Sequence, residues 1–147
     1  MVNQKILDKI ALFINYRDRS IYETTQKLNS LDIPEDSQAE IIEYLISEGY
    51  INEKRFVVSF VRGKFFHKHW GRRKIRYGLL RHRIPAEYIE EVINQEIDPQ
   101  DYHETILRLI KKKVGKVENF SKTDITQALY YLLSHGFDYE DVITYLK

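Results

Sequence analysis

The sequence predicts an all-α fold, and three observations support this class. Apolar residues recur every three or four positions along almost the whole chain, while strict alternation of apolar and polar residues is nearly absent. The 147 residues include only 6 Gly and 3 Pro, which disfavours a fold rich in tight turns. Cys is absent, which excludes disulfide scaffolds, thiolate zinc sites and cysteine nucleophiles.

The length and composition predict a domain that needs no disulfide or metal to stabilise its core. A compact body of this size buries about 68–70% of its unfolded surface. With 43% apolar and 31% charged residues, the composition is typical of a soluble chain. No apolar run approaches the ~18 residues of a membrane span. The first residues lack a signal-peptide core, so we expect a cytoplasmic protein that contacts no membrane.

The first third of the chain predicts three helices, at about residues 6–14, 21–31 and 34–48. The second helix begins with a capping box, in which the side chains of Ser20 and Glu23 bond each other's backbone N–H groups. The residues that mark the limits of the third helix are Pro34, expected in its first turn, and Gly49, just past its end.

The middle third predicts three more helices, at about residues 53–66, 71–82 and 85–93. Asn52 is expected to cap the first of them, and the polar stretch 67–69 to end it. The last third predicts a further three. Asp98-Pro99 is expected to start the first of these and Gly115 to end it. Ser121 with Asp124 is expected to cap the second, and Gly136 to end it. Asp138 is expected to cap the third.

One pattern occurs three times along the chain: a capped helix, a Leu, an apolar residue five positions later, and a short amphipathic helix. The equivalent pairs are Leu28 with Ile33, Leu79 with Ile84, and Leu132 with Phe137, at offsets of 51 and 53 residues. Small helical units bury their apolar faces by stacking in a row. The sequence therefore predicts three tandem three-helix repeats, 1–50, 51–97 and 98–147, in an elongated, curved array. The alternative is one compact nine-helix bundle.

The net charge of +1 hides a strong asymmetry along the chain. Residues 1–53 carry a net charge of −5, residues 54–83 carry +11 with no acidic residue, and residues 84–147 carry −5. Such a basic segment indicates a polyanionic partner or an acidic protein surface. The alternative is a solvated basic face that binds nothing.

The basic segment supplies the candidate binding residues. The predicted helix 71–82 is apolar on one narrow side and cationic around most of the rest. Arg outnumbers Lys in this segment. The planar guanidinium group of Arg can form two parallel hydrogen bonds with a phosphate or a carboxylate. Trp70 could stack on a base or an arginine, or it could close the junction between two helices as part of the core. The candidate residues are Arg62, Lys64, Lys68, Trp70, Arg72, Arg73, Lys74, Arg76, Arg81 and Arg83.

Catalytic and metal-binding patterns are not found in the sequence. The glycines are scattered singly, so no phosphate-binding loop is present. His67 and His69 could form a fragment of a metal site, but no third ligand is close in sequence. The remaining histidines, His82, His103 and His135, are isolated. We therefore predict a protein that is not an enzyme and has no catalytic residues, metal or cofactor.

A helix-turn-helix protein that binds duplex DNA is the alternative class of function. Each repeat joins two helices by a short turn, which is the general shape of that motif. However, the helices that follow the turns begin with acidic residues, such as Glu87 and Asp138. Acidic side chains at the start of a recognition helix would repel phosphate.

Four segments resemble the RecX family of bacterial regulators of the recombinase RecA. They are Ser20-x-x-Glu23-x-x-x-Lys27-Leu28; Leu45-x-x-x-Gly49-Tyr50-Ile51-Asn52-Glu53-x-Arg55-Phe56 with Phe60-Val61-Arg62-x-Lys64; Trp70-Gly71-Arg72-x-Lys74-Ile75-Arg76-x-x-Leu79; and Leu132-x-x-x-Gly136-Phe137-Asp138-Tyr139-Glu140-x-Val142. The two central matches are the specific ones. The chain departs from the family pattern at Thr24, where Leu is frequent, and at Leu31-Asp32, where Lys-Gly is typical.

The resemblance implies a regulator that binds RecA, and above all the RecA filament on single-stranded DNA. It also implies three tandem three-helix repeats. Such a protein would dampen recombinase activity and so affect recombination, DNA repair and the SOS response. We expect a monomer with weak direct binding to DNA. The alternative remains a transcriptional regulator that acts on duplex DNA.

Overall fold

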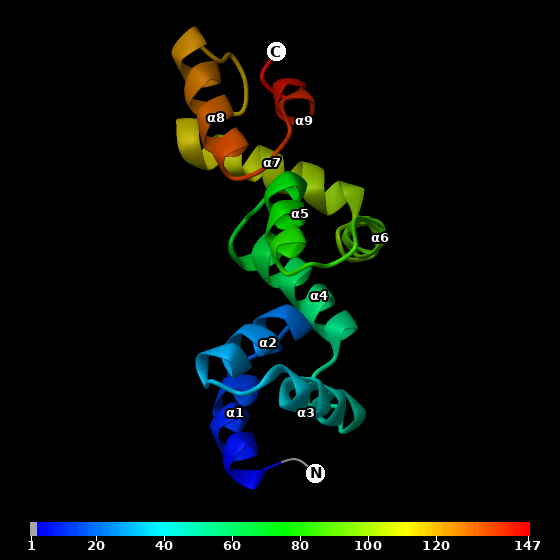
Figure 1. Ribbon diagram of the computed structural model, residues 1–147. Coiled ribbons are helices and arrows are strands. Elements are labelled where there is room, and N and C mark those ends of the chain that lie inside the picture. The colour runs from blue at the N-terminus through cyan, green and yellow to red at the C-terminus, as the bar shows by residue number, and fades with distance from the viewer. Residues whose placement is uncertain (1–2) are drawn as a thin grey trace. The chain divides into compact units, whose positions relative to one another are not determined.

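The computed structural model describes residues 3–147. Within this range it contains nine α-helices, one π-helical turn and no β-strand (Figure 1), which confirms the predicted all-α class. The elements are α1 (Gln4–Tyr16), α2 (Ile21–Ser30), α3 (Glu35–Ser47), α4 (Glu53–Arg62), η1 (Gly63–His67), α5 (Arg72–Arg81), α6 (Ala86–Glu96), α7 (Pro99–Val114), α8 (Lys122–Ser134) and α9 (Tyr139–Ile143). None of the helices in residues 3–147 is both long and apolar enough to cross a membrane.

Contacts between residues divide the chain into two compact units. The boundary lies between Ser59 and Phe60, inside α4. The first unit therefore contains α1 to α3, and the second contains α5 to α9. The division into repeats 1–50, 51–97 and 98–147, and the shape of the array, stay predictions.

The core of the first unit is formed by one helical hairpin and the helix before it. Helix α2 packs against both α1 and α3. The buried side chains include Ile10 of α1, Leu28 of α2, and Ile41 and Leu45 of α3. The apolar stripes predicted from the sequence therefore face one another.

The recurring Leu–apolar pairs are confirmed as equivalent positions in three identical helix ends. In each turn the apolar residue donates its backbone N–H to the Leu carbonyl, and the residue before it adopts a positive φ. The N···O distances are 3.3 Å for Ile33 to Leu28, 3.3 Å for Ile84 to Leu79 and 3.1 Å for Phe137 to Leu132. The positive φ values are 57° at Asp32, 60° at Arg83 and 93° at Gly136. This is the Schellman arrangement, which satisfies the last carbonyls of a helix.

Most of the predicted helix caps are confirmed. The capping boxes at Ser20 and Ser121 are both formed. Asn52 accepts a hydrogen bond from the backbone N–H of Arg55, at 3.0 Å. Helix α7 begins with Asp98 as its N-cap and ends at Gly115, whose φ is 75°.

Two details of the predicted helix ends were wrong. Pro34 and Pro85 are N-cap residues with extended ψ values, so α3 and α6 each begin one residue later than predicted. Asp138 is the N-cap of α9 but makes no side-chain capping bond. Its carboxylate lies instead 3.8 Å from the guanidinium of Arg73.

The start of α5 docks on the end of α8 within the second unit. The Gly71 N–H donates to the His135 carbonyl at 2.7 Å, and the Arg73 N–H donates to the Gly136 carbonyl at 3.1 Å. Gly71 must be glycine for this approach, since a Cβ there would lie 2.4 Å from the Gly136 carbonyl carbon and oxygen. The carbonyls at the end of one helix thus satisfy N–H groups at the start of another.

Candidate functional site

The ten candidate residues lie on one continuous segment, from the end of α4 through η1 and α5 to the following turn. The exposed ones are Arg62, Lys68, Arg73, Arg81 and Arg83, and the half-buried ones are Lys64, Trp70, Arg72, Lys74 and Arg76. Along the segment, exposed cations therefore alternate with cations that are held close to the protein.

Three of the candidate arginines are engaged by carboxylates from other elements of the second unit. Arg62 donates to Glu96 at 3.2 Å, and Arg73 lies near Asp138 and donates to the Leu133 carbonyl at 2.6 Å. Arg76 donates to Glu90 of α6. That hydrogen bond raises the pKa of Arg76.

The acid-free segment seen in the sequence is therefore partly neutralised in the folded chain. The carboxylates that neutralise it are 14 to 65 positions later in the sequence. A helical wheel drawn for residues 71–82 does not show these carboxylates, because they lie on α6 and at the N-cap of α9.

Trp70 lies at the junction of η1 and α5 and is half-buried. Its ring meets Phe60 edge to face, with 6.2 Å between centroids. The ammonium groups of Lys64 and Lys74 lie 4.8 Å and 4.6 Å from the indole centroid. Gly78 leaves room for this cluster, since a Cβ there would be 2.8 Å from the Phe60 ring. Trp70 thus packs in the junction and also carries two cations on its ring.

Arg72 packs against a buried tyrosine of α7. Its guanidinium carbon lies 4.0 Å from the Tyr102 ring centroid, and its backbone N–H donates to the Tyr102 hydroxyl at 3.1 Å. The Tyr102 ring stacks on Phe65 and contacts Phe137. Burial raises the pKa of Tyr102 to about 12. Arg72 therefore helps to hold α5 on α7.

The sequence reasoning missed a second group of basic residues. Arg108 and the run Lys111–Lys113 lie exposed on the second half of α7. Burial lowers the pKa of His69, and Arg108 and Lys112 lie close enough to His69 to lower it further. The sequence signal was the run of three lysines, Lys111–Lys113, that begins three residues after Arg108, but it lies in a region of net negative charge.

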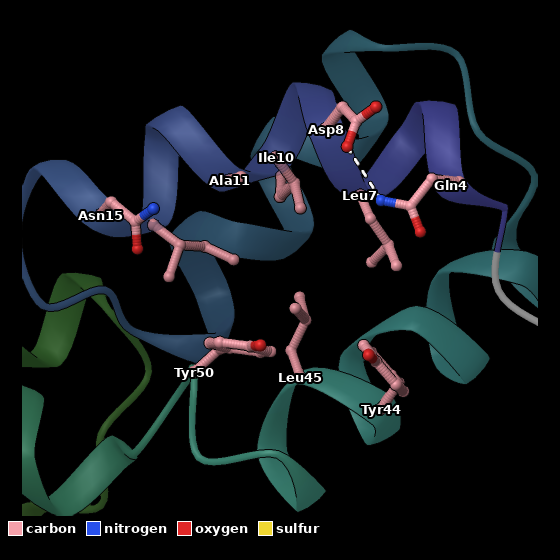
Figure 2. A pocket seen from close by; sticks show the side chains of 10 residues that line it. Gln4, Leu7, Asp8, Ile10, Ala11, Asn15, Tyr44, Leu45 and Tyr50 are labelled. Atoms are coloured by element: carbon pink, nitrogen blue, oxygen red, sulfur yellow. Dashed lines mark hydrogen bonds between the residues drawn. The ribbon is translucent and has the colours of Figure 1, made fainter.

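A pocket of about 250 Å³ opens in the first unit, between α1 and α3. Figure 2 shows Leu7, Ile10 and Leu45 pointing into it, with Asp8 at its edge accepting a hydrogen bond from Gln4 at 2.9 Å. Its lining residues contain no His, Ser, Lys or Cys that could pair as nucleophile and base. The pocket therefore offers no nucleophile–base pair of this kind.

A metal site is not supported by the arrangement of ligating side chains. Across residues 3–147, no group of three or more His, Asp or Glu side chains is placed to hold a metal ion. His67 ends η1, whereas His69 lies in the following loop with a φ of 57°.

Comparison with known proteins supports a specific family. Residues 52–93, which run from the start of α4 into α6, match the family model described as RecX, second three-helix domain. A regulatory protein RecX of Legionella pneumophila is 29% identical, and the alignment covers 95% of this chain and 91% of that protein. The chain belongs to the RecX family.

Other RecX relatives are longer than this chain. A regulatory protein RecX of Lactobacillus gasseri is 26% identical over 87% of this chain but only 47% of its own length. The chain thus spans about half the length of several curated relatives that it matches. The crystal structure of RecX from Lactobacillus salivarius superposes with a TM-score of 0.80 at 27% identity, covering 96% of this chain and 92% of that one. The RecX family is one of regulatory proteins.

Proposed function

We propose that this chain binds RecA, chiefly as the filament on single-stranded DNA, and inhibits recombinase activity by occupying the filament. The observation that carries the proposal is that the acid-free segment 54–83 falls inside the matched RecX domain, 52–93. A cationic surface can contact phosphates and acidic side chains together. This mode of action needs no catalytic group, and we propose that the protein acts as a monomer in the cytoplasm.

Two exposed cations of the basic segment are the best contact positions. Lys68 and Arg81 are exposed and form no ion pair in the described part of the chain. Arg72, Arg73 and Arg76 are engaged by Tyr102, Leu133 with Asp138, and Glu90. Reversing the charge of these three would therefore disturb folding as well as binding.

The test is the double substitution Lys68→Glu with Arg81→Glu, assayed for inhibition of RecA ATPase and strand exchange. We expect the concentration needed for inhibition to rise about tenfold or more, because two attractive charges become repulsive. The circular dichroism spectrum should be unchanged, since both side chains are exposed.

The matched control is Lys5→Glu with Lys9→Glu, on the exposed face of α1, which changes the net charge by the same amount. Inhibition that falls equally in the control would show a general charge effect. Undiminished inhibition by the folded Lys68/Arg81 variant would contradict the assignment of this surface. Tight, sequence-dependent binding to duplex DNA without RecA would favour a transcriptional regulator instead.

A further inference from the structure

The pocket of the first unit is a narrow groove that follows helix α1, and we call it the α1/α3 groove. Its lining residues on α1 run from Gln4 to Asn15, which corresponds to about 16 Å at a rise of 1.5 Å per residue. Its volume is only about 250 Å³, whereas a site for a drug-sized molecule typically holds about 300–1,000 Å³. A long groove of small volume suits the side chains of a peptide laid along the helix better than one compact molecule.

The floor of the α1/α3 groove is apolar and belongs to the core of the first unit. Figure 2 shows Leu7, Ile10 and Leu45 directed into the groove. Ile10 and Leu45 are only 1% and 2% exposed, because they also pack in the core. The packing of the core therefore fixes the shape of the floor before any partner binds, which lowers the entropic cost of binding.

Tyr50 forms one wall of the groove and lies on a turn that hydrogen bonds hold in place. Its backbone N–H donates to the Leu45 carbonyl at 2.9 Å. The Arg55 guanidinium donates to the carbonyls of Gly49 and Tyr50, at 3.4 Å, and to the Asp18 carboxylate at 2.8 Å. These bonds fix the backbone at Tyr50, while the residue stays 51% exposed. An exposed aromatic ring on a fixed backbone is typical of residues that dominate protein interfaces.

The polar groups around the groove keep hydrogen-bonding capacity for a partner. Asp8 is the only lining residue with a formal charge. One of its carboxylate oxygens accepts a hydrogen bond from Gln4 at 2.9 Å, and Asp8 forms no ion pair within residues 3–147. In the same range, the side chains of Asn15, Tyr44 and Tyr50 form no hydrogen bond. The groove therefore offers one unpaired carboxylate beside two tyrosine rings.

The charge around the groove is negative. On the side of α3 that carries Tyr44, Glu40 lies one turn before it and Glu48 one turn after it, and both are exposed. The two lysines of α1 lie on the neighbouring side of that helix, and neither lines the groove. Residues 1–59 carry seven basic and ten acidic side chains, a net charge of −3. A cation is therefore the complementary charge for this surface.

We propose that the α1/α3 groove is a docking site for a basic segment of a partner protein, with an arginine or lysine side chain lying in the groove. The aliphatic stem of such a side chain would cover the apolar floor, while its cationic head stays at the polar edge. There the head would meet the Asp8 carboxylate and the faces of the tyrosine rings, both of which attract cations. The first unit contains a similar contact within its own fold, since the Arg19 guanidinium carbon lies 3.7 Å from the Phe13 ring centroid.

The partner at this groove is a protein and not a nucleic acid. An acidic surface repels phosphate, and the groove presents a carboxylate at its edge. The groove also lies outside the basic segment 54–83, so the inference does not rest on the proposed function. Its test accordingly needs neither RecA nor DNA.

The experiment follows the methyl NMR signals of Leu7, Ile10 and Leu45 in the isotopically labelled full chain, during titration with a synthetic octapeptide of alternating arginine and leucine. We expect these signals to shift until the site is saturated, and the affinity to fall as the salt concentration rises. An octapeptide with glutamate in place of arginine should leave them unchanged. Shifts confined to other parts of the chain, or equal shifts with the glutamate peptide, would overturn the proposal.

The variant Asp8→Asn with Tyr50→Leu removes the charge and one ring while keeping the apolar floor. We expect the affinity for the arginine peptide to fall about tenfold, because an ion pair and a cation–π contact are both lost. The matched control is Asp32→Asn with Tyr16→Leu, since both residues are exposed in the same unit and neither lines the groove. All four side chains are exposed, so both variants should keep the circular dichroism spectrum. An equal loss of affinity in the two variants, or no loss in either, contradicts a site at the groove.

Two further probes separate a peptide site from simpler ones. Arginine amide, at the same concentration of guanidinium groups, should shift the groove signals far less than the peptide, because it covers only part of the groove. Equal shifts would show a site for a small cation and would overturn the proposal. Equal binding of a leucine–glutamine octapeptide would show an apolar groove without charge recognition and would also overturn it. Because RecA and DNA are absent, failure of these experiments leaves the recombinase proposal standing, and the reverse also holds.

Discussion

At the scale of single residues, Tyr102 links the candidate basic segment to the core of the second unit. Its side chain is 1% exposed, and its hydroxyl accepts the Arg72 backbone hydrogen bond while its ring carries the Arg72 guanidinium. A buried hydroxyl with a hydrogen-bond partner stabilises the fold, whereas a buried phenolate would be costly. Tyr102 should therefore make the stability of the protein sensitive to alkaline pH.

The pKa of Tyr102 sets the direction of that sensitivity. An unfolded tyrosine loses its proton near pH 10, whereas the folded residue does so at about pH 12. The folded chain binds more protons between these values, so its stability falls as the pH rises through this range. Urea unfolding should show a loss of stability between about pH 10 and pH 12 that is smaller in Tyr102→Phe. Equal losses in the two proteins would contradict this assignment.

At the scale of elements, the contact between the start of α5 and the end of α8 holds the second unit together. Helix α5 supplies Gly71, and the turn after α8 supplies His135 and Gly136. The same contact positions Trp70 and Arg73, which precede and follow it in the sequence. A change in this contact should therefore affect the basic segment as well as stability.

Gly71→Ala tests the contact directly. The added Cβ would lie 2.4–2.5 Å from backbone atoms of Gly136 and Phe137, which cannot move as a flexible side chain would. We expect a loss of about 1–3 kcal/mol in the free energy of unfolding. Gly63→Ala is the matched control, because a Cβ there meets nothing within 4 Å. A Gly71→Ala protein as stable as the control would show that the close approach is dispensable.

At the scale of the whole molecule, charge and packing follow the two compact units rather than the sequence thirds. Residues 1–59 carry seven basic and ten acidic side chains, whereas residues 60–147 carry sixteen basic and twelve acidic ones. The first unit is therefore acidic and the second basic. For the proposed function, this division predicts weak binding to bare nucleic acid, because the acidic first unit repels phosphate.

Separate cores predict separable unfolding of the two units. Trp70, the only tryptophan, reports on the second unit, while circular dichroism reports on both. Leu45→Ala removes a buried side chain from the first unit and should cost about 2–5 kcal/mol there. We expect an earlier transition by circular dichroism and an unchanged midpoint by Trp70 fluorescence. Leu132→Ala, in the second unit, should shift the fluorescence midpoint, and coincident transitions in the Leu45 variant would show one cooperative unit.

Local chemistry made much of the fold predictable from the sequence. The capping boxes at Ser20 and Ser121 are complete within four residues, and each Leu–apolar pair closes its turn within six. The apolar stripes follow from the helical period alone. Asp138 is the exception, because its carboxylate faces an arginine far away in the sequence instead of capping its own helix.

The candidate site depended on contacts that no local pattern contains. The sequence by itself determined the helices, their turns and the concentration of cations in residues 54–83. Only the tertiary structure decided that Arg76 meets Glu90, that Arg72 lies on Tyr102, and that Arg73 lies near Asp138. The physical reason is that helix formation and capping act over a few residues, whereas the state of a charge depends on every group that folding brings near it.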